Sequence, residues 1–401
     1  MGERSLQEAF SACGEDLREE RAFAEYYVAR ENGAALELAE RMLMDRRPVK
    51  ALLTGQRGAG KTVELMRLSR DVGSSLLPLF VSLELPPDRA MVPELLVATA
   101  QGMCQKAARA GVPVSDKVAK GLTSWVRDTL KVPAEDRSGP AGAAEALGKA
   151  AERLRRRELR PELAAAIEAR REELGQGLSE LASDIRSKGG KEPMLVLDGL
   201  DRAGRDQAVA FLLESGLQEL QFKCICTLPF AAIHSPIFRA LRQSFDSIAV
   251  QTLSEMTPGL LATGSGGVLD MRDLVDKRTG TGLMEPAALD MLLLNSGGNP
   301  GDLLRYTGSC CLKASMSGRA RIDVRTVEGV LDDHRLEMRR FLTAAEWGRL
   351  QALHRGKGEE EDELLASLLE SGAVLEYPAR KPMYHVHPAL VPMLKGREST
   401  A

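Results

Sequence analysis

The stretch of sequence that decides the fold runs from Val49 to Thr62 and reads VKALLTGQRGAGKT. Its first part, Val49–Thr54, is a short apolar run of the kind that forms a buried parallel strand. Its second part, Gly55–Thr62, follows the pattern G-x-x-x-x-G-K-T, and apolar residues at helical spacing come next, namely Leu65, Leu68 and Val72. The sequence therefore predicts a strand, a phosphate-binding loop and a helix in succession. We call Gly55–Thr62 the phosphate loop.

The phosphate loop predicts nucleotide binding for a direct physical reason. Its glycines let the backbone wrap a phosphate, and the N–H groups at the start of the following helix point at the anion. Lys61 is expected to reach the β- and γ-phosphates, which also makes it a catalytic candidate, and Thr62 is expected to place its hydroxyl on Mg²⁺. The predicted ligands are ATP or ADP with Mg²⁺. The binding residues expected from this segment are Gly55, Gly58, Ala59, Gly60, Lys61, Thr62 and Val63.

A second motif supplies the acidic groups that the phosphate loop lacks. Met194–Asp201 reads MLVLDGLD, an apolar run followed by two aspartates. Asp198 is the candidate for holding Mg²⁺, and Asp201 is the catalytic candidate for orienting or deprotonating the attacking water. Helix capping and surface solvation are the alternative roles for both side chains. Together the two motifs predict a Mg²⁺-dependent ATPase.

Further apolar runs alternate with helical patterns along the chain. The runs with strand character are Leu77–Leu85, Met194–Leu197, Phe222–Leu228 and Ser247–Val250. Strands separated by helices predict the α/β class, here a three-layer core built on a parallel sheet. Residues 86–193 carry almost no strand pattern, so we expect a helical insertion between the second and third strands.

The pattern changes along the chain predict four regions. Residues 1–46 are expected to form an N-terminal helical segment, and residues 47–256 the ATPase core with its insertion. Residues 257–340 have a purely helical pattern and are expected to form a lid. Residues 341–401 are expected to form a winged helix, because helices at 343–354 and 360–371 precede two short strands, Ala373–Tyr377 and Met383–His387.

The two motifs, LLTGQRGAGKT and LVLDGLD, resemble those of the AAA+ and STAND branch of P-loop ATPases, which have an ASCE-type core. Asp198, Gly199, Leu200 and Asp201 follow the pattern of the NACHT subgroup of STAND proteins, although Arg202 replaces its last acid. A typical AAA+ protein would have Glu immediately after the first Asp, where this chain has Gly199. The segment Gly298–Pro300 matches the Gly-x-Pro signature of the STAND helical subdomain.

The resemblance implies further site residues. Pro300 would pack near the nucleotide, and the segment Tyr27–Arg30 resembles the one that flanks adenine, which makes Arg30 a nucleotide-binding candidate. Thr227 ends a predicted strand where a γ-phosphate sensor is usual, so it is a catalytic candidate. Gly301 stands where relatives often have a sensor arginine, and Arg305, one turn later, is its potential substitute.

Charge and composition bear on partners and location. The formal charge of −3 gives no global attraction for nucleic acid or anionic membrane. Arg153–Arg160 is a local basic run, but the helix expected at 360–371 is acidic and would be repelled by DNA phosphates. No apolar stretch approaches the roughly 20 residues that span a bilayer, and the acidic N-terminus lacks a signal-peptide pattern. We expect a cytoplasmic protein that binds ATP and a protein partner or itself, without a membrane role.

These observations favour a molecular switch. The chain is expected to bind ATP, hydrolyse it slowly, and control partner binding or self-assembly through its nucleotide state. The family resemblance implies a role in bacterial defence or signalling. Two alternatives stay open: a DNA-associated AAA+ ATPase resembling initiation or transposition helpers, and a scaffold that binds nucleotide without hydrolysing it.

Overall fold

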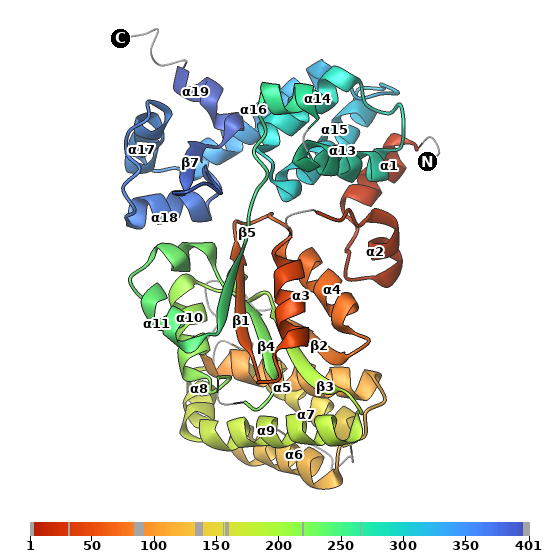
Figure 1. Ribbon diagram of the computed structural model, residues 1–401, viewed down its shortest axis with the longest axis vertical. Helices are drawn as coiled ribbons and strands as arrows, with labels where there is room; N and C mark the ends of the chain where they lie inside the picture. Colours follow the sequence, from red (N-terminus) through yellow and green to blue (C-terminus); the bar gives the residue numbers. More distant parts are fainter. Residues whose placement is uncertain are drawn as a thin grey trace. The chain divides into compact units, whose positions relative to one another are not determined.

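The computed structural model describes residues 4–30, 33–83, 92–132, 139–154, 156, 160–218, 220–264 and 266–395 (Figure 1). The chain forms two compact units. The sheet unit comprises Ala34–Thr54 and Glu64–Val250, and the lid unit comprises Met1–Gly33, Gly55–Val63 and Gln251–Ala401. The phosphate loop therefore packs with the lid unit, although the strand before it belongs to the sheet unit.

The sheet unit is built on a five-stranded sheet with the strand order β2-β3-β4-β1-β5. Neighbouring strands are parallel in the pairs β2–β3, β3–β4 and β4–β1. The strands have the bounds Lys50–Gly55 (β1), Leu76–Ser82 (β2), Glu192–Asp198 (β3), Lys223–Thr227 (β4) and Ser247–Gln251 (β5), so the predicted strands are confirmed. The last two residues of the predicted strand Leu77–Leu85 lie outside the described residues. One strand, β4, lies between the strand that precedes the phosphate loop and the strand that ends in Asp198. This is the ASCE-type order, and the predicted α/β class is confirmed.

Helices cover both faces of the sheet and make the three layers (Figure 1). Side chains alternate along each strand, so β1 sends Ala51 and Leu53 to one face and Leu52 to the other. The first face packs against α3 (Ala34–Met44) and α4 (Lys61–Val72). The second face packs against the insertion and against α10 (Arg205–Glu214) and α11 (Phe238–Ser244).

The predicted helical insertion is present within the sheet unit. Its helices are α5 (Val92–Arg109), α6 (Asp116–Leu130), α7 (Gly139–Leu154), α8 (Arg160–Ala169) and α9 (Arg171–Lys188). Their buried side chains join those of β2, β3 and β4 in one apolar cluster, so the insertion extends the core of the sheet unit. Part of the predicted basic run Arg153–Arg160 lies outside the described residues.

The lid unit has a separate helical core. Its helices are α1 (Leu6–Cys13), α2 (Glu20–Tyr26), α12 (Pro258–Thr263), α13 (Gly266–Thr279), α14 (Pro286–Ser296), α15 (Pro300–Met316) and α16 (Val324–Phe341). The α1 helix packs against α13 and α15. The expected N-terminal segment 1–46 is thus divided, because α1 and α2 join the lid unit whereas α3 packs on the sheet.

The C-terminal part of the lid unit combines two helices with a hairpin. The α17 (Ala344–His354) and α18 (Glu363–Glu370) helices precede β6 (Val374–Tyr377) and β7 (Met383–Val386), which pair antiparallel. A short 3-10 turn, Pro388–Leu390, and α19 (Val391–Lys395) follow. We call β6 and β7 the C-terminal hairpin. The helices and hairpin agree with the expected element order, and the winged-helix assignment stays a prediction.

Of the helices in the described part of the chain, none combines the length and the apolar character needed to cross a bilayer.

A buried histidine makes the stability of the lid unit sensitive to acid. His334 of α16 packs its ring against those of Tyr306 and His387, at centroid distances of 5.0 Å and 6.0 Å. Its Nδ1 lies 3.3 Å from Nη1 of Arg305. Burial, and then the positive charge of Arg305, lowers the pKa of His334 from 6.5 to about 4.

Acidification is therefore expected to destabilise the lid unit. Between the unfolded pKa of 6.5 and the folded pKa of about 4, the unfolded chain binds more protons at His334 than the folded chain does. Stability should fall as the pH drops through this window, by on the order of 2 kcal/mol. Urea unfolding at a series of pH values measures this loss.

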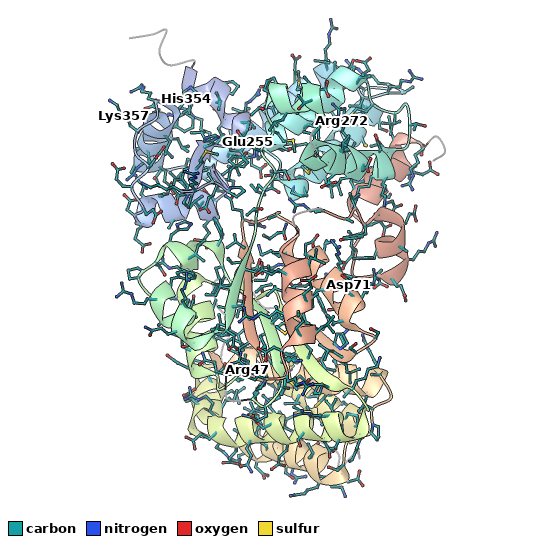
Figure 2. The ribbon with its side chains drawn as sticks, in the orientation of Figure 1. Arg47, Asp71, Glu255, Arg272, His354 and Lys357 are labelled. Atoms are coloured by element: carbon teal, nitrogen blue, oxygen red, sulfur yellow. The ribbon has the colours of Figure 1, made fainter. Side chains whose placement is uncertain are left out.

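The variant His334→Gln should show a shallower dependence on pH, because the titrating group is gone. His354→Gln changes an exposed histidine of α17 (Figure 2) and should keep the dependence of the unmodified chain. An unaltered dependence in His334→Gln would show that the histidine does not carry the effect.

Candidate nucleotide-binding site

The carboxyl ends of β1, β4 and β3 lie at the same edge of the sheet. β1 is followed directly by the phosphate loop, β4 ends at Thr227 and β3 ends at Asp198. Leu53 pairs with Thr227, and Leu197 pairs with Cys226, so the carboxyl ends of the three strands are in register. Ligands of open α/β sheets bind outside the carboxyl ends of the strands. The strand order thus gives Asp198 and Thr227 neighbouring positions at the edge where such ligands bind.

The backbone after Asp198 explains why glycine follows it. Asp198 is 1% exposed, and its carbonyl accepts a hydrogen bond of 2.8 Å from the N–H of Leu83. Gly199 has φ +93°, and a Cβ there would lie 2.7 Å from the carbonyl oxygen of Leu83. A glutamate at this position, as in typical AAA+ proteins, would be strained by both effects. The backbone conformation at Gly199 and the nearby Leu83 carbonyl therefore account for the departure from the AAA+ pattern.

The two catalytic candidates of the sheet unit lie together. The N–H of Asp201 donates to Oγ1 of Thr227 over 3.3 Å. Thr227 is fully buried, whereas Asp201 is half-buried in the middle of a 3-10 turn, Leu200–Arg202. The predicted water-orienting acid and the predicted γ-phosphate sensor are thus connected through the backbone of Asp201.

The carbonyl groups of the phosphate loop are bound by donors of the lid unit. Nζ of Lys61 donates to the carbonyls of Gly55 and Gln56, over 2.8 Å and 3.2 Å. The Gly58 carbonyl accepts from the N–H of Gly301 over 3.0 Å. The side chains of Arg30 and Asn299 donate to the Ala59 and Arg57 carbonyls, so the five carbonyls from Gly55 to Ala59 all have donors.

This arrangement orients the amides of the loop. In a planar trans peptide the N–H points opposite to the C=O, so the amides of these peptides point away from the donors. One of them, the N–H of Ala59, closes a turn onto the Gln56 carbonyl over 3.1 Å. Glycines 58 and 60, with φ +84° and +91°, give the loop the alternation that forms an anion-binding concavity. The donor set therefore fits a phosphate.

Arg30 connects the segment before the sheet to the phosphate loop. Its Nη1 donates to the Ala59 carbonyl over 2.8 Å, and its Nη2 donates to the Thr252 carbonyl over 3.1 Å. The sequence resemblance implied a nucleotide-binding role for this segment. The structure places Arg30 against the loop, while Thr62 and Val63 lie half-buried in the first turn of α4.

Asn299 holds the start of α15 on the phosphate loop. Its Oδ1 caps the helix by accepting from the N–H groups of Gly301 and Asp302, and its Nδ2 donates to the Arg57 carbonyl over 2.8 Å. A Cβ on Gly58 would lie 2.3 Å from Oδ1 of Asn299, so only glycine permits this approach. Pro300, the first residue of α15, follows the cap directly. The predicted Gly-x-Pro turn and the phosphate loop are thus in contact.

Arg305, the potential sensor arginine, contacts residues of α15 and α16 in the lid unit. Its Nη2 donates to Oδ1 of Asp302 over 2.7 Å. The other carboxylate oxygen of Asp302 lies 3.4 Å from Nε2 of His387. Burial opposes ionisation of Asp302, but its partners His387 and Arg305 outweigh it and hold the pKa of the carboxyl below its usual value. Arg305 therefore belongs to a charged cluster with Asp302 and His387, one turn after the start of α15.

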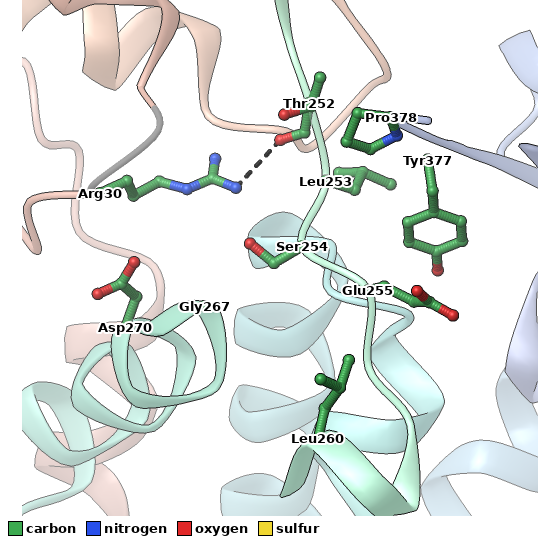
Figure 3. A pocket seen from close by; sticks show the side chains of 10 residues that line it. All are labelled: Arg30, Thr252, Leu253, Ser254, Glu255, Leu260, Gly267, Asp270, Tyr377 and Pro378. Carbon is green, nitrogen blue, oxygen red and sulfur yellow. Dashed lines mark hydrogen bonds between the residues drawn. The ribbon is translucent and has the colours of Figure 1, made fainter. Parts of the chain in front are cut away.

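A pocket of about 250 Å³ adjoins Arg30 within the lid unit (Figure 3). Figure 3 shows the carboxylate of Asp270 pointing toward the Arg30 side chain, with Leu260 and Ser254 on other walls. Tyr377 of the C-terminal hairpin and Pro378, which follows β6, complete the lining together with Thr252, Leu253, Glu255 and Gly267. Sequence reasoning missed Asp270, Glu255 and Tyr377, because no motif marks residues that meet only in the folded lid unit.

Mg²⁺ prefers a few carboxylate or hydroxyl ligands and completes its shell with water and substrate phosphates. Thr62 and Asp198 offer such oxygen donors, so the residue types fit the ion. Among the described residues, no cluster of three or more His, Cys, Asp or Glu side chains offers a separate metal site.

No family model matches the chain, and no curated protein matches its sequence. Solved structures align with most of the chain at low sequence identity and low TM-score. The Aeropyrum pernix ORC2 protein in ADPNP–ADP complexes is 12% identical with a TM-score of 0.45, over 94% of this chain and 97% of that chain. The Aeropyrum pernix ORC1 protein in complex with DNA is 13% identical with a TM-score of 0.41, over 97% and 96%. The Thermotoga maritima RuvB Holliday junction branch migration motor is 12% identical with a TM-score of 0.40, over 92% and 95%.

The close approach at Gly199 leads to a stability prediction. Gly199→Ala is expected to lower the free energy of unfolding by about 2–4 kcal/mol, because the left-handed conformation and the clash with Leu83 both add to the cost. Gly216→Ala is the matched control, since Gly216 has φ +72° but open space around its Cβ position. It should lose only about 1 kcal/mol. Equal losses in urea unfolding would remove the steric explanation.

Proposed function

We propose that the chain is an ATP-binding switch of the AAA+ and STAND branch of P-loop ATPases, whose nucleotide state controls a protein partner or self-assembly. The contact of the Asn299 cap with the phosphate loop carries this proposal. Phosphates bound on the loop would lie next to the first turn of α15. Their presence would therefore affect the position of the lid helices. Strand order and the two motifs support the ATPase class.

The residues have separate roles in this proposal. The loop amides and Lys61 would bind the β- and γ-phosphates, and Thr62 and Asp198 would hold Mg²⁺, which neutralises phosphate charge when bound. Asp201 would orient or deprotonate the attacking water, and Thr227 would respond to the γ-phosphate. Turnover would be slow and would reset the switch.

Arg30, which donates to the Ala59 carbonyl, is proposed to contribute to nucleotide binding by holding the phosphate loop.

A DNA-associated AAA+ ATPase is the second candidate. One of the structures similar in fold was solved in complex with DNA. In this chain, Arg380 and Lys381 are exposed between the strands of the C-terminal hairpin, where they can meet phosphate. The exposed residues Glu359–Asp362 before α18 act against it by charge repulsion. DNA-stimulated hydrolysis that falls steeply with salt would favour this candidate over the switch.

Loss of the Lys61 ammonium tests the proposed binding site. Lys61→Ala should weaken ATP and ADP binding by about a hundredfold or more, because a charge-assisted contact to two phosphates is lost. Isothermal titration calorimetry measures the affinity. Lys357→Ala, at an exposed lysine far along the sequence (Figure 2), is the matched control and should bind normally. Unchanged binding by Lys61→Ala would contradict the assignment.

Loss of the Asp201 carboxylate tests the proposed hydrolysis. Asp201→Asn should lower the rate of phosphate release about 10²–10⁴-fold while ATP binding is kept, because the amide cannot act as a base. Release of phosphate under single-turnover conditions measures the chemical step. Full activity in the variant would reject the role of Asp201. Stoichiometric nucleotide with no phosphate release in the unmodified chain would instead favour a nucleotide-locked scaffold.

A further inference from the structure

The C-terminal hairpin is hydrogen-bonded to the phosphate loop through the side chain of Gln56. Nε2 of Gln56 donates to the Val374 carbonyl, and Oε1 accepts from the N–H of Glu376, both over 2.9 Å. The two groups belong to alternate residues of β6, in a sheet of only two described strands. One side-chain amide thus forms the bonds that a neighbouring strand would form. Gln56 is 3% exposed, so both bonds are shielded from water.

Tyr377, the last residue of β6, makes a second contact beside the loop. Its ring packs with Ala59 of the phosphate loop and with Leu253 and Leu375. Its hydroxyl donates to the Gly297 carbonyl over 2.7 Å, immediately before the turn that holds Asn299. The hairpin is therefore docked on the phosphate loop and on the start of α15 together. Burial also raises the pKa of the Tyr377 hydroxyl well above its usual value, which keeps it a donor.

Lys61 connects this docking to nucleotide binding. In the described arrangement its ammonium bonds to the carbonyls of Gly55 and Gln56. Gln56 is therefore held at two places: Lys61 binds its backbone carbonyl, and β6 binds its side-chain amide. Binding of phosphates by Lys61 would withdraw the ammonium from the Gln56 carbonyl. That carbonyl would keep only the turn bond from the Ala59 N–H, so the backbone would hold the Gln56 amide less firmly in line with β6.

We propose that Gln56 is a positioning residue that makes hairpin docking and phosphate binding competing states of the phosphate loop. Nucleotide then loosens the hairpin, and the docked hairpin weakens nucleotide binding by the same factor, because the coupling is reciprocal. This inference rests on the proposed nucleotide function. It adds the hairpin as the element that reports the state of the loop.

Two measurements on the full chain test the coupling. Amide hydrogen exchange of residues 374–386, with and without ATP and Mg²⁺, measures docking of the hairpin, and calorimetry measures ATP affinity. In the unmodified chain, ATP should speed exchange in this segment. Gln56→Met keeps the side-chain length but removes both hydrogen bonds, so it should speed exchange without ATP and tighten ATP binding about threefold to tenfold.

Tyr377→Phe leaves the phosphate loop unaltered and removes only the bond to Gly297, so it should shift both readouts in the same direction. Gln243→Ala, at an exposed glutamine of α11, is the matched control and should shift neither. A merely structural role for Gln56 would weaken ATP binding in Gln56→Met, and that result overturns the proposal, as does ATP-induced protection of the hairpin.

The two proposals can fail separately. If the unmodified chain binds no ATP, the nucleotide function is rejected, yet unchanged exchange of residues 374–386 in Gln56→Met would still reject the link to the hairpin. If ATP binds in a Lys61-dependent way and hairpin exchange is the same with and without it, only the coupling is rejected.

Discussion

The side chain of Asn299 is the constraint on which the lid unit depends. One amide caps α15 through its oxygen and binds the Arg57 carbonyl through its nitrogen, while Gly58 leaves the space that the oxygen needs. The start of α15 is thereby held against Arg57 and Gly58 of the phosphate loop. Asp302, in the first turn of the same helix, extends this arrangement to Arg305 and His387. A shift of the loop backbone would therefore displace the start of α15 and the contacts that this helix makes.

The phosphate loop is consequently not an isolated turn but a strongly bonded part of the lid unit. Five successive carbonyls are bound by Lys61, Asn299, Gly301 and Arg30, and the adjoining side chain of Gln56 is bound by β6. Carbonyls held in this way turn amides toward an anion at little further entropic cost. The same bonds make the loop sensitive to its protein neighbours, which is the property that a switch requires.

The sequence predicted those features that short stretches determine. Val49–Thr54 and Met194–Leu197 are continuous apolar runs, so their strands could be recognised, and the loop glycines have a spacing that few other structures demand. The link between Gln56 and β6 could not be predicted, because its partners are 318 and 320 residues apart and Gln56 occupies an unrestricted position of the motif. Helical periodicity likewise shows that residues 1–46 are helical, but it does not show which core each helix joins. Arg305 was proposed from its position, and only the fold shows its pairing with Asp302.

The most direct test of the central claim is a crystal structure of the chain with Mg²⁺ and a non-hydrolysable ATP analogue. The account predicts β- and γ-phosphate density within hydrogen-bond distance of the amides at the start of α4, with Nζ of Lys61 on these phosphates and no longer on the carbonyls of Gly55 and Gln56. Nucleotide bound elsewhere, or phosphates on the loop with Lys61 still on both carbonyls, would contradict it.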